Sequence, residues 1–371
     1  MLTCLQTFYA EEVHSFLLAH IFNQVMLVKR NLRYLLPALG IAALLCFSSE
    51  AADAVKEGLR ICGMSVIPAL FPFFVLTNYF LGIRSARQPS RMADRLMSAC
   101  FGLRGSCMTP LLLSFMGGYP VGVSCTVRLY QDGVLSKREA ERLLLFCNNS
   151  GPAFFFGVIG GTVLHSARSA ALLYLAHILA ALCCGAFLRM PEKERLIIRR
   201  VEPQQTQQRG FLDAISASCA SLLQISGLIV FFSVVLSLIE ASGLLKLFQR
   251  ALPFLPAQTL SAMLCGFFEL SGGVVRLSSC IHAEELAAFL MGWGGICVHL
   301  QAMSFWKSAH FQPRGYFASK LLHGMLSVLF VRLFLSPTPK LAVCVSTIMV
   351  FGIFFPQIRQ KWGRNLQRNT V

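Results

Sequence analysis

Long apolar runs limit what this chain can fold into more than any other feature of its sequence. They cover residues 34–48, 59–82, 143–164, 170–188, 214–239, 286–305, 316–335 and 341–355. A helix needs roughly 20 apolar residues to cross a bilayer, so most runs are long enough, and only the first and last are short. Hydrophobic residues form 55% of the chain, which is more than a soluble domain of this length could bury. The sequence predicts an all-α, polytopic helical membrane protein with about 8 spans.

The positions of the basic residues explain the net charge of +16. Lys and Arg gather around 29–33, 83–107, 189–210 and 357–371, and such residues concentrate in the cytoplasmic loops of membrane proteins. We therefore predict that both termini are cytoplasmic and that the partner of the basic segments is a lipid bilayer, not nucleic acid. Lys307, His310, Arg314 and Lys320 are assigned to the same side. The acidic segment 49–57 is predicted to be a loop on the outside.

An inverted-topology repeat follows if the two glycine-broken apolar stretches are re-entrant hairpins. These stretches are 108–127 and 260–279, and each is followed by a polar helix start and a second broken run. The charge pattern then places one half upside down relative to the other, as in many secondary transporters. The alternative is that these glycine-containing segments are kinked helices with small residues packed together.

This reading divides the chain into four parts. Residues 1–33 form a cytoplasmic segment, in which 1–25 are interpreted as a surface helix or a misassigned start, because Met26 opens a basic stretch before an apolar run. The first transmembrane half covers 34–210 and the second covers 211–356. A basic cytoplasmic tail covers 357–371.

Four polar breaks in the apolar runs form the predicted solute site, because non-helical backbone at membrane depth is tolerated only where protein or a water-filled cavity surrounds it. Glycines let backbone approach a solute closely, and asparagine offers both donors and an acceptor. The predicted substrate-binding residues are Gly117, Gly118, Tyr119, Pro120, Asn148, Asn149, Ser150, Gly151, Glu269, Ser271, Gly272, Gly273, Gly294, Gly295, His299 and Gln301. For Asn148 and Asn149, capping of helix ends stays open as the alternative.

Ionisable residues inside the membrane are costly and usually functional. Glu269 is predicted either to couple a cation or proton, or to form a structural ion pair with Arg276. Arg128 and Arg276 follow the two hairpins and are predicted to attract an anion, or else to reach the headgroups as boundary charges. His299 is either protonatable or a packing residue. His177 and His323 are interpreted as packing.

No enzyme signature is found, since the sequence has no H-E-x-x-H, P-loop, G-x-S-x-G or acidic metal cluster. We therefore predict that the protein is not an enzyme and that it binds no cofactor and no metal.

Four motifs in this order resemble those of a known family: "GGYPVG", "LSKREAERLLLFCNNSGPAFFFGVIG", "FELSGG" and "MGWGGICVHLQ". They are similar to the YlbJ-type (SpoVV) sporulation integral membrane proteins, within the wider group that carries a nucleoside-recognition or Gate domain. The resemblance covers about residues 55–335, and Asn-Asn-Ser-Gly-Pro is its most specific part. One departure is that the first hairpin lacks the lysine often found after its turn; Ser124 and then Arg128 follow instead.

The resemblance implies a role in endospore formation, with transport of dipicolinate across the outer forespore membrane. We therefore expect a transporter or channel for a small polar, anionic solute. A nucleoside-like solute is one alternative, and a non-transporting membrane scaffold or assembly factor of the spore envelope is another. The expected partners are the small-molecule solute, a second copy in a homodimer or other sporulation membrane proteins.

Overall fold

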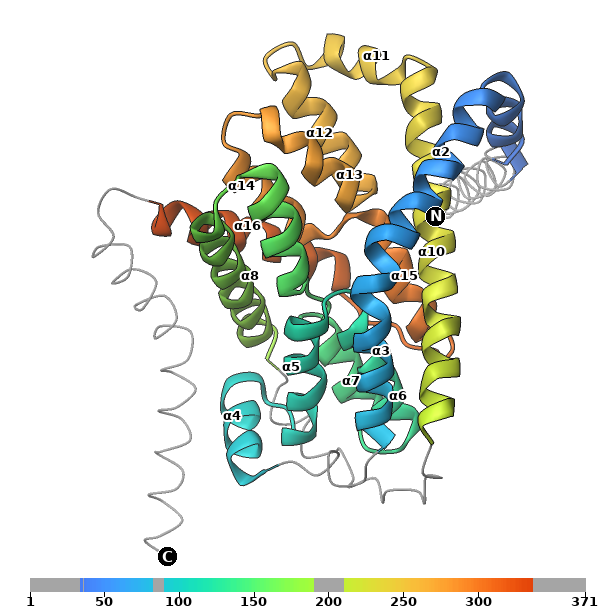
Figure 1. Ribbon diagram of the computed structural model, residues 1–371. Coiled ribbons are helices and arrows are strands. Elements are labelled where there is room, and N and C mark those ends of the chain that lie inside the picture. Colours follow the sequence, from blue (N-terminus) through green and yellow to red (C-terminus); the bar gives the residue numbers. More distant parts are fainter. Residues whose placement is uncertain (1–33, 36, 83–89, 190–209, 336–371) are drawn as a thin grey trace, which may run out of the picture.

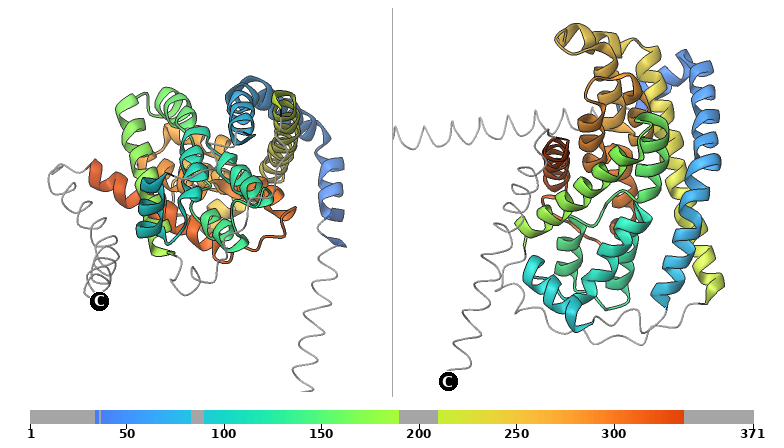
Figure 2. Two further views of the ribbon diagram at one scale, coloured as in Figure 1. Left: turned by 90° about the horizontal axis from the view of Figure 1, so that it is seen from below. Right: turned by 60° about the vertical axis from the view of Figure 1, so that its left-hand side comes forward.

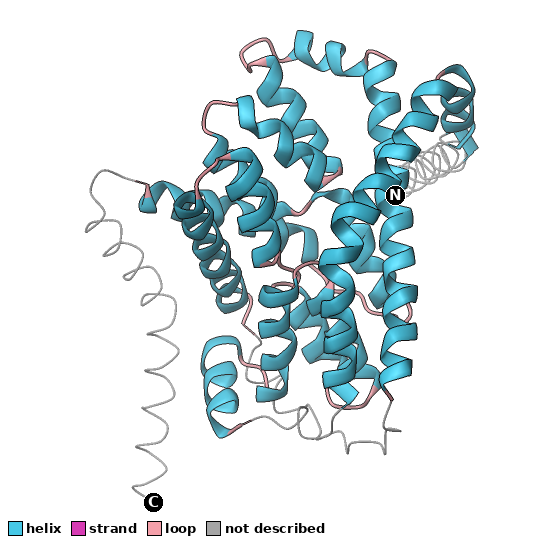
Figure 3. Ribbon diagram, viewed as in Figure 1, coloured by secondary structure: helices cyan, strands magenta, loops and turns pink. Residues whose placement is uncertain are grey.

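The protein is all-helical throughout the part that the computed structural model describes, which comprises residues 34–35, 37–82, 90–189 and 210–335 (Figures 1 and 3). The prediction of an all-α chain is confirmed for these residues. The cytoplasmic segment predicted at 1–33, the short run at 341–355 and the basic tail lie outside them, as do the basic segments at 83–89 and 190–209.

Two long helical rods stand side by side along one flank (Figure 1). The first consists of α2 (Ser48–Ile61), a π-helical turn η1 (Cys62–Val66) and α3 (Ile67–Gly82), and the second is α10 (Phe211–Ala241). They pack closely at Gly58, where an added Cβ would lie 3.0 Å from the Cα of Val230. The predicted outside loop at 49–57 is wrong, because these residues form most of α2.

The acidic residues of α2 explain why this segment is helical despite its charge. Asp53 pairs with Lys56 at 2.9 Å, and Glu57 pairs with Arg60 at 2.6 Å, each three residues apart. Such spacing brings two side chains together on one helix face, and here that face is exposed. The charges therefore support a helix where we predicted a turn.

The same order of elements occurs twice along the chain. After the first rod come α4 (Arg91–Phe101), η3 (Gly105–Cys107), α5 (Met108–Gly117), α6 (Val121–Gln131), α7 (Lys137–Leu144), η4 (Phe154–Val163) and α8 (Ala167–Phe187). After α10 come α11 (Leu244–Ala251), α12 (Ala257–Phe268), α13 (Leu270–Val275), η5 (Arg276–Ser279), α14 (Ala283–Trp293), α15 (Gly295–Lys307) and α16 (Tyr316–Phe334). Each half thus contains a short helix, a hairpin of half-helices, a broken pair and a long helix.

Four helices in the described residues are long and apolar enough to cross a membrane: Ala167–Phe187, Phe211–Ala241, Ala283–Lys307 and Tyr316–Phe334. Two bent pairs would raise this number to 6, namely Pro37–Cys46 with Ser48–Met64 and Arg91–Phe101 with Gly105–Gly117. The structure therefore supports a multi-pass membrane protein, while the expected 8 spans are not confirmed. The run at 143–164 is divided between α7, a non-helical segment and η4, so it forms no single long helix.

The helix α16 runs across the molecule, in a direction different from that of the rods. In the view from below in Figure 2, α10 is seen end-on whereas α16 lies in the plane of the picture. It packs against α8 and α14. Gly292 of α14 and Gly324 of α16 meet so closely that a Cβ on Gly292 would lie 2.5 Å from the Cα of Gly324. This contact holds the middle of α16 directly against α14.

Candidate functional site

The first hairpin turn and the first broken run meet through their backbones. Gly118 ends α5 with a φ of +76°, a conformation that favours glycine. A Cβ on Gly118 would lie 2.9 Å from the backbone N of Gly151, so a larger residue would push the two segments apart. Pro152 follows directly, and the residue before a proline disfavours helical backbone. The run "CNNSG" is therefore held open against the hairpin turn.

The second hairpin and the second broken run meet in the same way. The break between α14 and α15 consists of Gly294 and Gly295, with φ values of +92° and +79°. A Cβ on Gly295 would lie 3.2 Å from the backbone N of Leu270, at the start of α13. The two halves of the chain therefore each build one junction between a hairpin and a broken helix pair.

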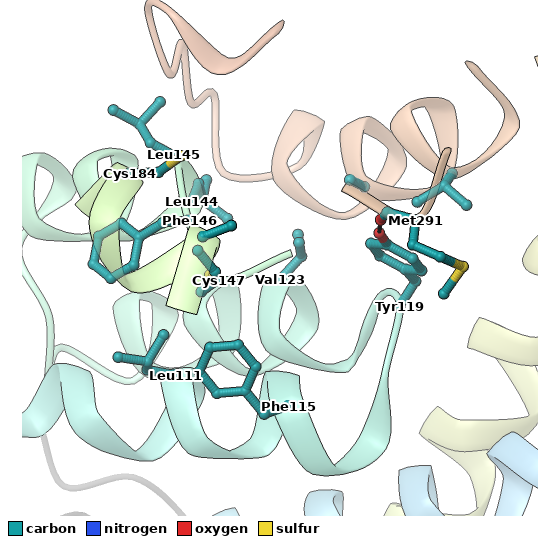
Figure 4. Packing of buried hydrophobic residues seen from close by; sticks show 14 of the residues in the cluster. Leu111, Phe115, Tyr119, Val123, Leu144, Leu145, Phe146, Cys147, Cys184 and Met291 are labelled. Atoms are coloured by element: carbon teal, nitrogen blue, oxygen red, sulfur yellow. Dashed lines mark hydrogen bonds between the residues drawn. The ribbon is translucent and has the colours of Figure 1, made fainter. Parts of the chain in front are cut away.

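Side chains join these two junctions across the molecule. The Tyr119 hydroxyl of the first hairpin donates to the carbonyl O of Met291, just before the second break (Figure 4). Asn148 Nδ2 donates to the hydroxyl of Tyr316 at 2.7 Å, and this hydroxyl lies 3.2 Å from His299 Nδ1. The structure thus brings residues of three predicted breaks to one place, and the Gly295 contact ties the second hairpin to them.

Lys320 is the main residue that the sequence analysis missed. Its side chain is buried, at 1% exposure, and Nζ donates to the carbonyl O of Asn148 at 2.7 Å. Nζ also lies 3.2 Å from His323 Nδ1 and 5.5 Å from the centroid of the Tyr119 ring. Our assignment of Lys320 to the cytoplasmic basic residues is wrong, because α16 begins at Tyr316 and carries Lys320 into the core.

Two histidines interpreted as packing residues belong to the same place. His177 Nε2 accepts from the backbone N of Ser150 at 3.1 Å. His323 Nε2 lies 3.0 Å from the carbonyl O of His177, and the two rings lie 4.4 Å apart. We call the set Asn148, Ser150, His177, His299, Tyr316, Lys320 and His323 the central polar cluster.

A sequence signal for the cluster exists on α16. Tyr316, Lys320 and His323 are spaced four and then three residues apart, which places them on one face of the helix. Ser319 and Ser327 are also buried on α16. A polar stripe inside an otherwise apolar run indicates a helix that faces other protein instead of lipid.

Several buried polar atoms of the cluster have no hydrogen-bond partner among the described residues. These atoms are Asn148 Oδ1, His177 Nδ1 and His299 Nε2, and the neighbouring Asn149 Oδ1 shares this property. Buried polar groups in proteins are almost always paired, so unpaired ones mark a place for water or a ligand. Three unpaired polar atoms in a cluster that also contains a buried ammonium make this cluster the strongest candidate for a solute site.

The two asparagines play different parts. Asn149 Nδ2 donates to the hydroxyl of Ser114 and to the carbonyl O of Phe146, both at 2.9 Å, so it ties the end of α7 to α5. Asn148 uses its amide on Tyr316, inside the cluster. Neither side-chain oxygen accepts from a helix N–H, which is what an N-cap would do.

Glu269 has a structural position. Its carboxylate caps α13 by accepting from the backbone N of Ser271 at 2.9 Å and of Gly272 at 2.7 Å. The expected pair with Arg276 is not formed, because Arg276 binds Glu240 of α10 at 2.6 Å. The Glu269 carboxylate therefore stabilises the N-terminus of α13 in the second hairpin.

Other predicted residues are held by partners outside the cluster. Arg128 donates to the carbonyl O and to Oδ1 of Asn78, both at 2.8 Å. Gln301 Nε2 lies 3.3 Å from Cys297 Sγ within its own helix. The structure therefore does not bring Arg128, Arg276 or Gln301 to Lys320, and the cation near the first hairpin comes from α16.

Aromatic side chains surround His299 on α15. The Trp293 ring stacks on Phe267 at 5.0 Å, and its centroid lies 4.5 Å from that of the His299 imidazole. The centroid of the Phe317 ring lies 5.2 Å from that of His299, and the two rings meet edge to face. Aromatic faces of this kind stack well on planar solutes.

The sequence comparison supports a membrane role. The chain is 27% identical over 327 residues to the sporulation integral membrane protein YlbJ of Bacillus subtilis (strain 168), and the alignment covers 80% of each chain. No family model matches the chain, and no solved structure is similar to it. The similarity confirms the resemblance to the YlbJ-type sporulation integral membrane proteins, whereas the wider Gate-domain group is not confirmed.

Proposed function

We propose that this chain, a homologue of the YlbJ-type sporulation integral membrane proteins, is a transporter or channel for a small anionic solute. The favoured solute is dipicolinate, moved across the outer forespore membrane during endospore formation. The solute site is the central polar cluster, with the second hairpin and Trp293 beside it.

The observation that carries this proposal is the isolation of Lys320. Its ammonium is buried and contacts no carboxylate among the described residues; its polar contacts are one carbonyl O and one imidazole. An uncompensated buried charge is expensive in a membrane protein and usually marks a substrate or ion pathway. An anionic solute would supply the missing charge.

The architecture favours transport over a scaffold. Each half of the chain pairs a hairpin with a broken helix, and Tyr119 of the first hairpin joins the two junctions by donating to the carbonyl O of Met291. We propose that the two halves are inverted repeats, as in transporters that hold the solute between broken helices. A scaffold would need neither the breaks nor a buried cation.

The chemistry of the cluster suits a planar dicarboxylate. Lys320 would bind one carboxylate, since a charged hydrogen bond is the strongest polar contact available there. The N-terminus of α15 at Gly295 has no side-chain cap, and the positive end of a helix would favour a second negative group. Trp293 and His299 meet edge to face, at 79°, so one of the two rings would stack against the solute ring while the other contacts its edge.

The experiment that tests this proposal uses the full chain in proteoliposomes. Vesicles preloaded with unlabelled dipicolinate should exchange it for external labelled dipicolinate far faster than protein-free vesicles. K320M should lose this exchange while inserting normally, and K307M, at an exposed position at the end of α15, should keep it.

Three outcomes separate the candidate functions. Equal exchange in wild type and protein-free vesicles would contradict dipicolinate transport. Exchange that a nucleoside blocks better than dipicolinate would support the nucleoside-like solute. Normal dipicolinate content in spores of a deletion strain would contradict dipicolinate transport and favour the scaffold.

A further inference from the structure

The hydrogen-bond geometry around His323 fixes where its protons lie. Nε2 lies 3.0 Å from the carbonyl O of His177, and a carbonyl oxygen only accepts, so Nε2 carries a hydrogen. In the neutral ring Nδ1 then holds the lone pair. Nδ1 lies 3.2 Å from Lys320 Nζ, so the ammonium donates to it. Lys320 and His323 are therefore arranged to share one proton along a single N–H···N axis.

The same reasoning fixes the neighbouring ring. The backbone N of Ser150 donates to His177 Nε2, so that nitrogen holds a lone pair and Nδ1 carries the hydrogen. This Nδ1 is buried with no partner among the described residues. His177 therefore contacts His323 through its backbone carbonyl O, and its ring does not accept a proton from His323. The proton of the pair is confined to Lys320 and His323.

No acidic group faces this pair from the described elements packed against it. The titratable neighbours are His177 and Cys184 from α8, Cys147 before the first break, Tyr119 from the first hairpin, and His299 from α15. Helix α14 contributes Gly292 against Gly324. The pair therefore holds one positive charge without a countercharge.

We propose that Lys320 and His323 form the site of a coupling proton, so that the anion is carried together with one proton. This inference rests on the proposed transport function. When the shared proton moves, the N–H bond at Nζ breaks and one forms at His323 Nδ1, so the charge of the pair is conserved until a proton leaves it.

The physical reason is the cost of an unbalanced buried charge. With neither proton nor anion the pair is uncharged. With both, the ammonium compensates one carboxylate and the positive end of α15 favours the other. With only one of them a lone charge remains buried. The two compensated states should be the ones that move easily between the faces of the membrane, and such a cycle links anion movement to proton movement.

The test measures accumulation in proteoliposomes whose membrane potential is clamped at zero with potassium and valinomycin. With one proton per anion, an interior that is more alkaline by one pH unit should drive about tenfold accumulation of labelled dipicolinate. Without the gradient, the label should only equilibrate. H323N should lose the accumulation, and H310N, at an exposed position between α15 and α16, should keep it.

Each result decides between the proposals. If wild type exchanges dipicolinate but a pH gradient drives no accumulation, the coupling proton is contradicted and transport stands. If wild type does not exchange dipicolinate at all, transport fails and the coupling fails with it. Accumulation by H323N at the wild-type ratio would exclude His323 as the proton site. The wild-type ratio is decisive even if H323N does not fold.

Discussion

Two buried charges, Glu139 and Lys320, show how differently this protein treats ionised side chains. Both are 1% exposed. Glu139 accepts from Arg104 Nε at 2.6 Å, from the Ser136 backbone N at 3.0 Å and from the Ser136 hydroxyl at 2.8 Å. Lys320 has one carbonyl O and one imidazole. The carboxylate is fully balanced, and the ammonium is not.

The difference separates a structural charge from the one to which we assign a function in our proposal. Glu139 lies in the first turn of α7, where it forms a capping box with Ser136 and joins that helix to the segment before α5 through Arg104. A charge balanced in this way stabilises a fixed arrangement. Lys320 lies between the first hairpin and the first broken run, against the Tyr119 ring and the carbonyl O of Asn148, and it has no such balancing charge among the described residues.

The largest expected effect is on stability, from E139A. This change leaves Arg104 without its partner and removes the capping box, and breaking a buried pair in this way costs about 3 kcal/mol. Denaturant unfolding in detergent would measure the loss. E50A, at an exposed position on α2, should change stability by less than about 0.5 kcal/mol. Equal stability of the two variants would contradict the structural role of Glu139.

The next effect is on transport, from K320M. Methionine nearly matches the volume of lysine but removes an uncompensated charge, so the free energy of unfolding should stay the same or rise. Exchange of labelled dipicolinate should fall by about 10- to 100-fold, as expected for losing a charged hydrogen bond worth about 1.5–3 kcal/mol. If K320M is strongly destabilised yet exchanges dipicolinate normally, Lys320 is a structural charge like Glu139, and our distinction between the two is wrong.

A smaller effect is the pH dependence of the Glu139 contribution. Burial raises the pKa of Glu139, but the hydrogen bonds from Arg104 and Ser136 outweigh burial, so its pKa lies below the usual 4.5. The stabilisation is therefore fully present above pH 4.5 and is lost as the pH falls through the lower, folded value. The stability gap between wild type and E139Q should shrink in that range. If the difference in unfolding free energy between wild type and E139Q stays constant as the pH falls below 4.5, the ionised Glu139 carboxylate does not supply this stabilisation.

The positions of the helix breaks could be predicted from the sequence. Glycine and proline act on the backbone at their own position, so "NNSGP" and "GWGG" identify interruptions without knowledge of the fold. Gly118, Gly294 and Gly295 adopt positive φ at three of these positions. The sequence also indicated Asn148 and His299, which the structure places in the central polar cluster.

The partners of the ionisable residues could not be predicted in this way. Arg276 pairs with Glu240, which lies on α10, and not with Glu269, seven residues before it. Lys320 follows a basic loop in the sequence, and only the packing of α16 against α8 and α14 buries it. Pairing and burial are properties of tertiary packing, so charge counting along the chain assigned Lys320 to the surface.

The smallest expected effect separates charge from positioning within the cluster. Y316F removes the hydroxyl that Asn148 Nδ2 donates to and that lies 3.2 Å from His299 Nδ1, but it leaves Lys320 charged. Losing a neutral hydrogen bond costs about 1 kcal/mol, so dipicolinate exchange should fall by only about 5-fold. Y79F, at an exposed position on α3, should leave exchange unchanged. If Y316F abolishes exchange as completely as K320M, the cluster acts by holding the breaks in place; if the effects differ as expected, the charge of Lys320 is what the solute requires.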